Sequence, residues 1–185
     1  MTDPSSTATS RDRFVVDPPD GVAPEIGGWL WALDDARRRT KDSLRGLDTA
    51  VLDWVDAASQ NSIGTLLAHI VAIEMDWLYV EGLEQSIPPD VLALLPPHVR
   101  DEQGRLMAVP GITLDEHLAR LDAARVRLRL GMGGLGAEEF RRVRHFPHYD
   151  VTPEWVLHHL TQHEAEHRGE IMAIRVRAER ALGST

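Results

Sequence analysis

Residues 152–174 have the sequence TPEWVLHHLTQHEAEHRGEIMAI, and this stretch does most to decide the expected fold. Thr152 is suited to cap a helix, and Pro153 is suited to its first position. Apolar side chains then recur at three- and four-residue steps, the period of a helix with one face in a core. The same stripe includes His163 and His167. The pattern predicts a long final helix with two histidines on its inward face.

The two histidines of this helix form a candidate metal site. Residues four apart lie one turn above each other on the same face, so both imidazoles can bind one ion. Neutral imidazole is a common ligand of zinc, nickel, copper and iron. The alternative is a pair of core histidines that buried carboxylates satisfy by hydrogen bonds. His69, beside the inward face of an earlier predicted helix, is the leading candidate for a third ligand. Three ligands and an open fourth position are typical of catalytic sites.

The rest of the chain predicts three more long helices and no strand. The first apolar stripe, Ile26–Leu47, is interrupted only by Arg37 and Thr40. Thr113 and Glu116 match the capping box that opens a helix. Together with the final helix, the predicted helices cover about residues 24–47, 62–82, 113–130 and 153–181.

A link of about thirty residues, 83–112, separates the second and third predicted helices. It contains two pairs of prolines, with room between them for a short helix over Val91–Leu95. Gly131 begins a glycine-rich run that is expected to end the third helix. A link of this length can cross the bundle and let the helices on either side run parallel. We therefore expect an all-α four-helix bundle with a long crossover.

Length and composition fit one soluble globular domain of 185 residues, 43% apolar and 26% charged. We expect a flexible arm over residues 1–20 and a single domain over residues 21–185. A net charge of −9 argues against a nucleic-acid partner. The absence of cysteine excludes disulfides and a cysteine nucleophile. Because no signal peptide and no apolar run of about 18 residues is apparent, we expect no membrane span and a cytoplasmic location.

Residues 163–167 also match the H-E-x-x-H pattern of zinc peptidases, in which the glutamate is the general base. Only 18 residues follow His167 and none is a histidine, so the third ligand of the extended peptidase motif is missing. We therefore disfavour a peptidase but keep Glu164 as a candidate catalytic residue. His159 and Asp76 lie one and two helical turns from histidines of the proposed site, and they are candidate pocket-lining residues.

Two segments resemble the DinB/YfiT-like metalloproteins. The first, Asn61–Ile70, carries the run S-I-G-T-L-L-A-H, and the second, Trp155–Ile171, carries H-E-A-E-H followed at once by Arg-Gly. The resemblance extends as architecture over about residues 22–182. It implies a four-helix bundle with up-down-down-up topology. It also implies a three-histidine metal site, which falls here on His69, His163 and His167.

The family resemblance also implies a function. Most members described as enzymes are metal-dependent S-transferases that use a low-molecular-weight thiol such as bacillithiol or mycothiol. We therefore expect a zinc- or nickel-dependent S-transferase acting on a small electrophile. A metal-dependent hydrolase and a non-catalytic, metal-stabilised bundle are the alternatives. Glu166 and Glu170 stand where many members carry His and Gln, which leaves the substrate open. A homodimer is also expected, because Trp29 and Trp31 point to different faces of the first helix and one would be exposed.

Overall fold

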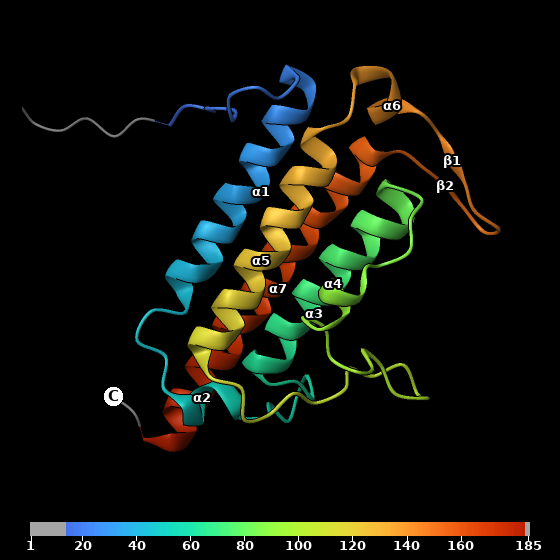
Figure 1. Cartoon of the computed structure of the whole chain (residues 1–185). Helices are drawn as coiled ribbons and strands as arrows, with labels where there is room; N and C mark the ends of the chain where they lie inside the picture. Colours follow the sequence, from blue (N-terminus) through green and yellow to red (C-terminus); the bar gives the residue numbers. More distant parts are fainter. Residues whose placement is uncertain (1–13, 184–185) are drawn as a thin grey trace, which may run out of the picture.

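The computed structural model describes residues 14–183, so most of the predicted N-terminal arm lies outside the described residues. Four long helices pack side by side along their lengths (Figure 1). They are α1 (Pro24–Ser43), α3 (Ile63–Asp76), α5 (Leu114–Gly133) and α7 (Pro153–Leu182). The closest packing joins α1 to α7, α3 to α5 and α3 to α7. The expectation of an all-α fold is confirmed.

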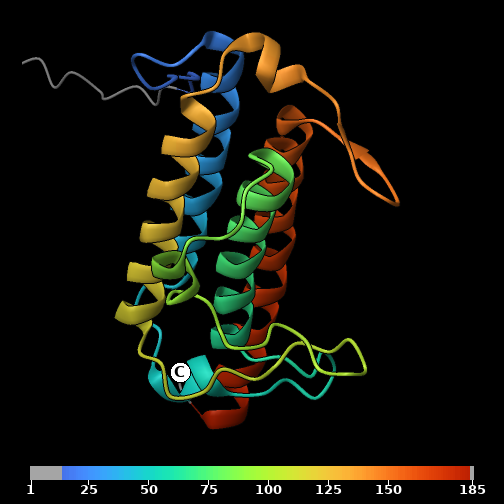
Figure 2. The same cartoon turned by 45° about the vertical axis from the view of Figure 1, so that its right-hand side comes forward.

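The helices run in two directions, as both views show. In Figure 2, α1 and α7 run from the end near α6 (Ala137–Arg141) towards the end that carries α2 (Thr49–Asp53). The other two long helices, α3 and α5, run the opposite way. The link over residues 83–113 carries α4 (Pro89–Leu92) and returns along α3 to the start of α5. This link covers one side of α3.

The predicted helix caps form. The Thr113 hydroxyl accepts from the backbone of Glu116, whose carboxylate accepts in return, completing the capping box. Thr152 caps α7 by accepting from the backbone N–H of Trp155 at 3.1 Å. The third helix ends within the glycine-rich run that begins at Gly131, as expected, because α5 ends at Gly133. A Cβ at Gly131 would lie only 3.0 Å from Leu78 Cδ1, so this glycine allows close helix packing instead of ending the helix.

Three local elements differ from expectation. The short α2 was not predicted. At its C-terminal end, α3 continues as a π-helix, η1 (Trp77–Gly82), a rare form that often lies near functional sites. The expectation of no strand is wrong, because β1 (Arg144–His145) and β2 (Asp150–Val151) pair antiparallel before α7. Strands of two residues are too short to show an alternating pattern in the sequence.

A buried layer of charges crosses the middle of the bundle, with one residue from each long helix. Arg37 donates to Glu74 at 2.6 Å and to Glu164 at 2.7 Å. Arg125 donates to the same two carboxylates at 2.9 Å each. All four residues are at most 5% exposed. Burial alone would raise the pKa of Glu74, but the charges and hydrogen bonds of Arg125 and Arg37 lower it. We call these four residues the ionic layer.

Two expectations change, one about an apolar helix of membrane length and one about an exposed tryptophan on the first helix. Ile63–Gly82 is long and apolar enough, by length and composition, to cross a membrane, although no such segment was expected. However, 78% of its apolar window is buried inside the bundle, as in the central helix of a water-soluble protein. Trp29 and Trp31 are both partly buried, so neither supplies the exposed face that motivated the homodimer. Dimerisation stays a prediction without that support.

Candidate metal centre

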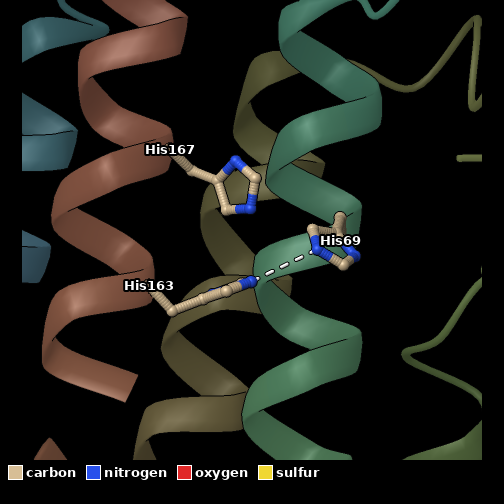
Figure 3. A group of neighbouring side chains, drawn as sticks. All are labelled: His69, His163 and His167. Atoms are coloured by element: carbon tan, nitrogen blue, oxygen red, sulfur yellow. Dashed lines mark hydrogen bonds between the residues drawn. The ribbon is translucent and has the colours of Figure 1, made fainter. Parts of the chain in front are cut away.

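Three imidazoles converge between α3 and α7 (Figure 3). His163 and His167 lie one turn apart on α7 and point across to His69 on α3. The Nε2 atoms of His163 and His69 are 3.2 Å apart. One ligand nitrogen from each of the three rings lies within 4.8 Å of the other two. The structure therefore brings together the three histidines that the sequence proposed as ligands.

The geometry of the cluster fits a divalent ion. Tetrahedral zinc with Zn–N bonds of about 2.0–2.1 Å places neighbouring nitrogens about 3.3 Å apart. The observed 3.2 Å between two of the nitrogens is close to this value. His69 is 5% exposed, while the other two histidines are only partly buried. The cluster therefore lies near the surface on the side of α7.

The protonation states also fit a metal site. Burial, together with the charge of His167, lowers the pKa of His69 to about 4. Burial and the neighbouring histidines lower the pKa of His163 to about 3. Both rings are therefore neutral at pH 7, and neutral imidazole is the form that binds a metal ion.

Two consecutive hydrogen bonds orient the side chain of His167. Its Nδ1 lies 3.2 Å from a carboxylate oxygen of Glu170, one turn further along α7. The other oxygen of Glu170 accepts from the Asn61 side chain at 3.1 Å. With the proton on Nδ1, the Nε2 of His167 keeps its lone pair for an ion. Glu170 appeared in the sequence only as a departure from the family pattern, although its three-residue spacing from His167 could have suggested this contact.

Replacing Glu170 with alanine is expected to weaken metal affinity by about 10- to 100-fold, because His167 loses the group that orients it. Glu170→Gln keeps a hydrogen-bond acceptor for His167 and should lose less metal affinity. Competition with a chromophoric chelator measures the affinity. Glu166→Ala is the matched control, because Glu166 is an exposed carboxylate on the same helix. Equal affinities for the Glu170→Ala and Glu166→Ala proteins would show that Glu170 does not support the site.

A family comparison agrees with this site. The sequence model described as the DinB superfamily matches residues 32–171, a range that includes all three histidines. The chain belongs to the DinB superfamily. None of the curated proteins compared with it matches. The resemblance proposed from the two histidine-bearing segments is confirmed, and the three-histidine cluster is compatible with metal binding by a DinB protein.

The proposed catalytic residue Glu164 does not join the DinB histidine cluster. It belongs to the ionic layer, where one oxygen accepts from Arg37 and the other from Arg125. It is 1% exposed, so it cannot exchange protons with a substrate on the surface side of the cluster. The H-E-x-x-H match fixes the face of the helix on which Glu164 lies relative to the histidines, but not which side chains of the other helices surround it. The structure gives Glu164 a role in packing.

The two candidate pocket residues have different surroundings. His159 lies one turn before His163, with its ring centroid 5.8 Å away, and it stacks on Trp155 at 5.0 Å. Trp155 is 46% exposed, so this stacked pair reaches the surface. Asp76 lies on the wall of a cavity beside α3, and burial raises the pKa of its carboxyl. Neither His159 nor Asp76 belongs to the three-residue cluster.

Proposed function

We propose that this DinB protein is a divalent-metal-dependent S-transferase that joins a low-molecular-weight thiol to a small electrophile. The observation that carries the proposal is the convergence of three histidines, of which His69 and His163 are neutral at pH 7. We further infer the up-down-down-up topology of DinB bundles. The shared direction of α3 and α5, opposite to that of α1 and α7, supports this inference.

The chemistry follows from what the residues supply. A divalent ion held by the three imidazoles would lower the pKa of a thiol in its remaining position. The chain has no cysteine, so the nucleophilic sulfur must belong to a substrate. The thiol loses its proton to solvent, a carbon–sulfur bond forms, and the leaving group departs with the bonding electron pair. Glu170 and Asn61 keep His167 oriented throughout.

The direct test is the formation of a thioether adduct. Untagged protein loaded with zinc or nickel is incubated with bacillithiol, mycothiol or a simpler thiol and with 1-chloro-2,4-dinitrobenzene. We expect an adduct at a rate that is nearly independent of pH above neutrality, because the thiol is already ionised there. The uncatalysed reaction rises with pH over the same range, since a free thiol ionises only near pH 8.5. Chelation should lower the rate of adduct formation to that of the uncatalysed reaction, and added metal should restore the faster rate.

His163→Ala should lose the metal-dependent adduct reaction, whereas His98→Ala, which changes an exposed histidine far from the cluster in sequence, should retain it. A hydrolase would give another result. It would cleave esters or amides without added thiol, at a rate that rises through the pKa of metal-activated water. Thiol-free hydrolysis together with no metal-dependent adduct from the thiol panel would replace the transferase with a hydrolase.

A further inference from the structure

A largely apolar cavity of about 580 Å³ lies between α3 and the link over residues 83–113. Its α3 wall consists of Ala72, Ile73 and Asp76. The opposite wall is formed by aliphatic side chains and prolines of the link, together with Arg100. Asp76 and Arg100 are the only charged residues in the lining. This volume and composition are typical of a site for a small molecule.

The α3 wall of the cavity begins one helical turn after His69. Ala72, Ile73 and Asp76 follow His69 by three, four and seven residues, so they share its face of α3. From the link, Arg100 lines the same cavity, and its positive charge contributes to the lowered pKa of His69. A molecule bound in this cavity would therefore lie against the turn of α3 that follows His69.

Arg100 is one of four arginines among residues 14–183 that form no ion pair, and it is the one that lines this cavity. Most arginines of this part of the chain form ion pairs, but Arg100 has no carboxylate within 4.0 Å among residues 14–183. Its recorded hydrogen bond goes to the backbone carbonyl of Gly104 at 2.7 Å. The neighbouring carboxylate of Asp101 is engaged by Arg105 at 2.8 Å. Arg100 is exposed and lines the cavity, so its guanidinium is available to a ligand that enters it.

The electrostatics favour an anionic ligand. Imidazole ligands carry no charge, so they leave the charge of a divalent ion unreduced, and Arg100 adds a further positive charge on the cavity wall. This positive charge favours an anion in the cavity. Asp76 lies about 10 Å along α3 from His69, at the helical rise of 1.5 Å per residue. The Asp76 carboxylate therefore disfavours a ligand orientation in which the anionic group lies at the end of the cavity away from His69.

We propose that the cavity binds the electrophilic substrate, with its apolar body against Ile73 and the link and its anionic group, a carboxylate in the simplest case, paired with Arg100. The identity of this ligand as the electrophile rests on the proposed S-transferase function. The binding of an apolar anion does not depend on that function, because the cavity and Arg100 are present without the metal ion.

The test compares 3-phenylpropionate with 3-phenylpropanol, which share an apolar body and differ in the charged group. Isothermal titration calorimetry measures both with chelator-treated and with zinc-loaded protein. We expect the carboxylate to bind more tightly than the alcohol to both forms. Arg100→Met should weaken carboxylate binding by about tenfold or more and leave alcohol binding unchanged, because only a charge-assisted pair is lost. Arg100→Lys should recover part of the loss.

Arg120→Met is the matched control, because Arg120 also has no ion pair within the described residues and lines a neighbouring cavity. The Arg120→Met substitution should change the affinity for neither the carboxylate nor the alcohol. A bulky Leu92→Trp substitution, at a lining residue that is 52% exposed, should weaken both probes. Equal affinity for the two probes, no binding of either, or equal losses in the Arg100 and Arg120 variants would overturn the proposal. Arg100-dependent binding without any thioether formation would instead remove the S-transferase function and leave the anion site.

Discussion

Replacing Glu164 with alanine is expected to lower the free energy of unfolding by about 3–5 kcal/mol. The substitution leaves Arg37 and Arg125 buried with only one of their two shared carboxylates. A buried charge without its partner costs far more than the pair contributes. Denaturant unfolding followed by circular dichroism measures the change. Glu166→Ala, an exposed site two residues along α7, should change stability by less than about 0.5 kcal/mol.

A loss below about 1 kcal/mol in Glu164→Ala would contradict the ionic layer as a buried network. The pH dependence gives a second check. The folded-state pKa of Glu74 is lowered from its ordinary value of 4.5, so its stabilising contribution is complete above that pH. The contribution is lost as the pH falls from about 4.5 through the lower folded-state pKa. Acid should therefore destabilise the wild type, and less of this effect should remain in Glu74→Gln.

Replacing any one of the three clustered histidines is expected to abolish metal retention. Elemental analysis of the wild type should find about one divalent ion per chain. His69→Ala, His163→Ala and His167→Ala should each weaken affinity by roughly a hundredfold or more, because each removes one of three donors that converge on one point. Far-ultraviolet circular dichroism should show unchanged helical content, since the rings contribute little to the apolar core.

His98→Ala is the control for metal retention, because this histidine is exposed on the link. His117 is unsuitable, since it is 1% exposed and its replacement would leave a cavity at the start of α5. Full metal retention by the His69 variant would reduce the site to the two α7 histidines. An absence of metal from the wild type after growth with zinc and nickel would favour a structural role for all three.

Features that depend on one helix could be predicted from the sequence. The caps of α5 and α7 use local hydrogen bonds, and their residue types mark the helix starts directly. The pairing of His163 with His167 follows from the helical period. For His69 the helical period indicated only a place beside an inward face, and the family resemblance strengthened its choice as the third ligand, because residues on different helices have no fixed spacing in sequence.

Features that depend on several helices could not be predicted in the same way. Arg37 broke the apolar stripe of the first helix, which was a visible signal, but its two partners come from α3 and α7. Glu164 became a candidate catalytic residue by analogy with H-E-x-x-H, whereas its side chain is buried between Arg37 and Arg125 from two other helices. Arg100 lies on an irregular link where no periodic pattern fixes a direction. Only the packed structure brings it towards His69.

His69 and His163 are separated by 94 residues along the chain, yet their rings meet. An ion shared between them would act as a reversible cross-link that closes a long loop in the chain. Closing a long loop restricts an unfolded chain more than closing a short one, although the dependence on length is weak. An ion that binds only the folded chain adds about 2.7 kcal/mol of stability when its free concentration is a hundred times its dissociation constant. The supply of metal would thereby set the lifetime of the folded protein as well as its activity.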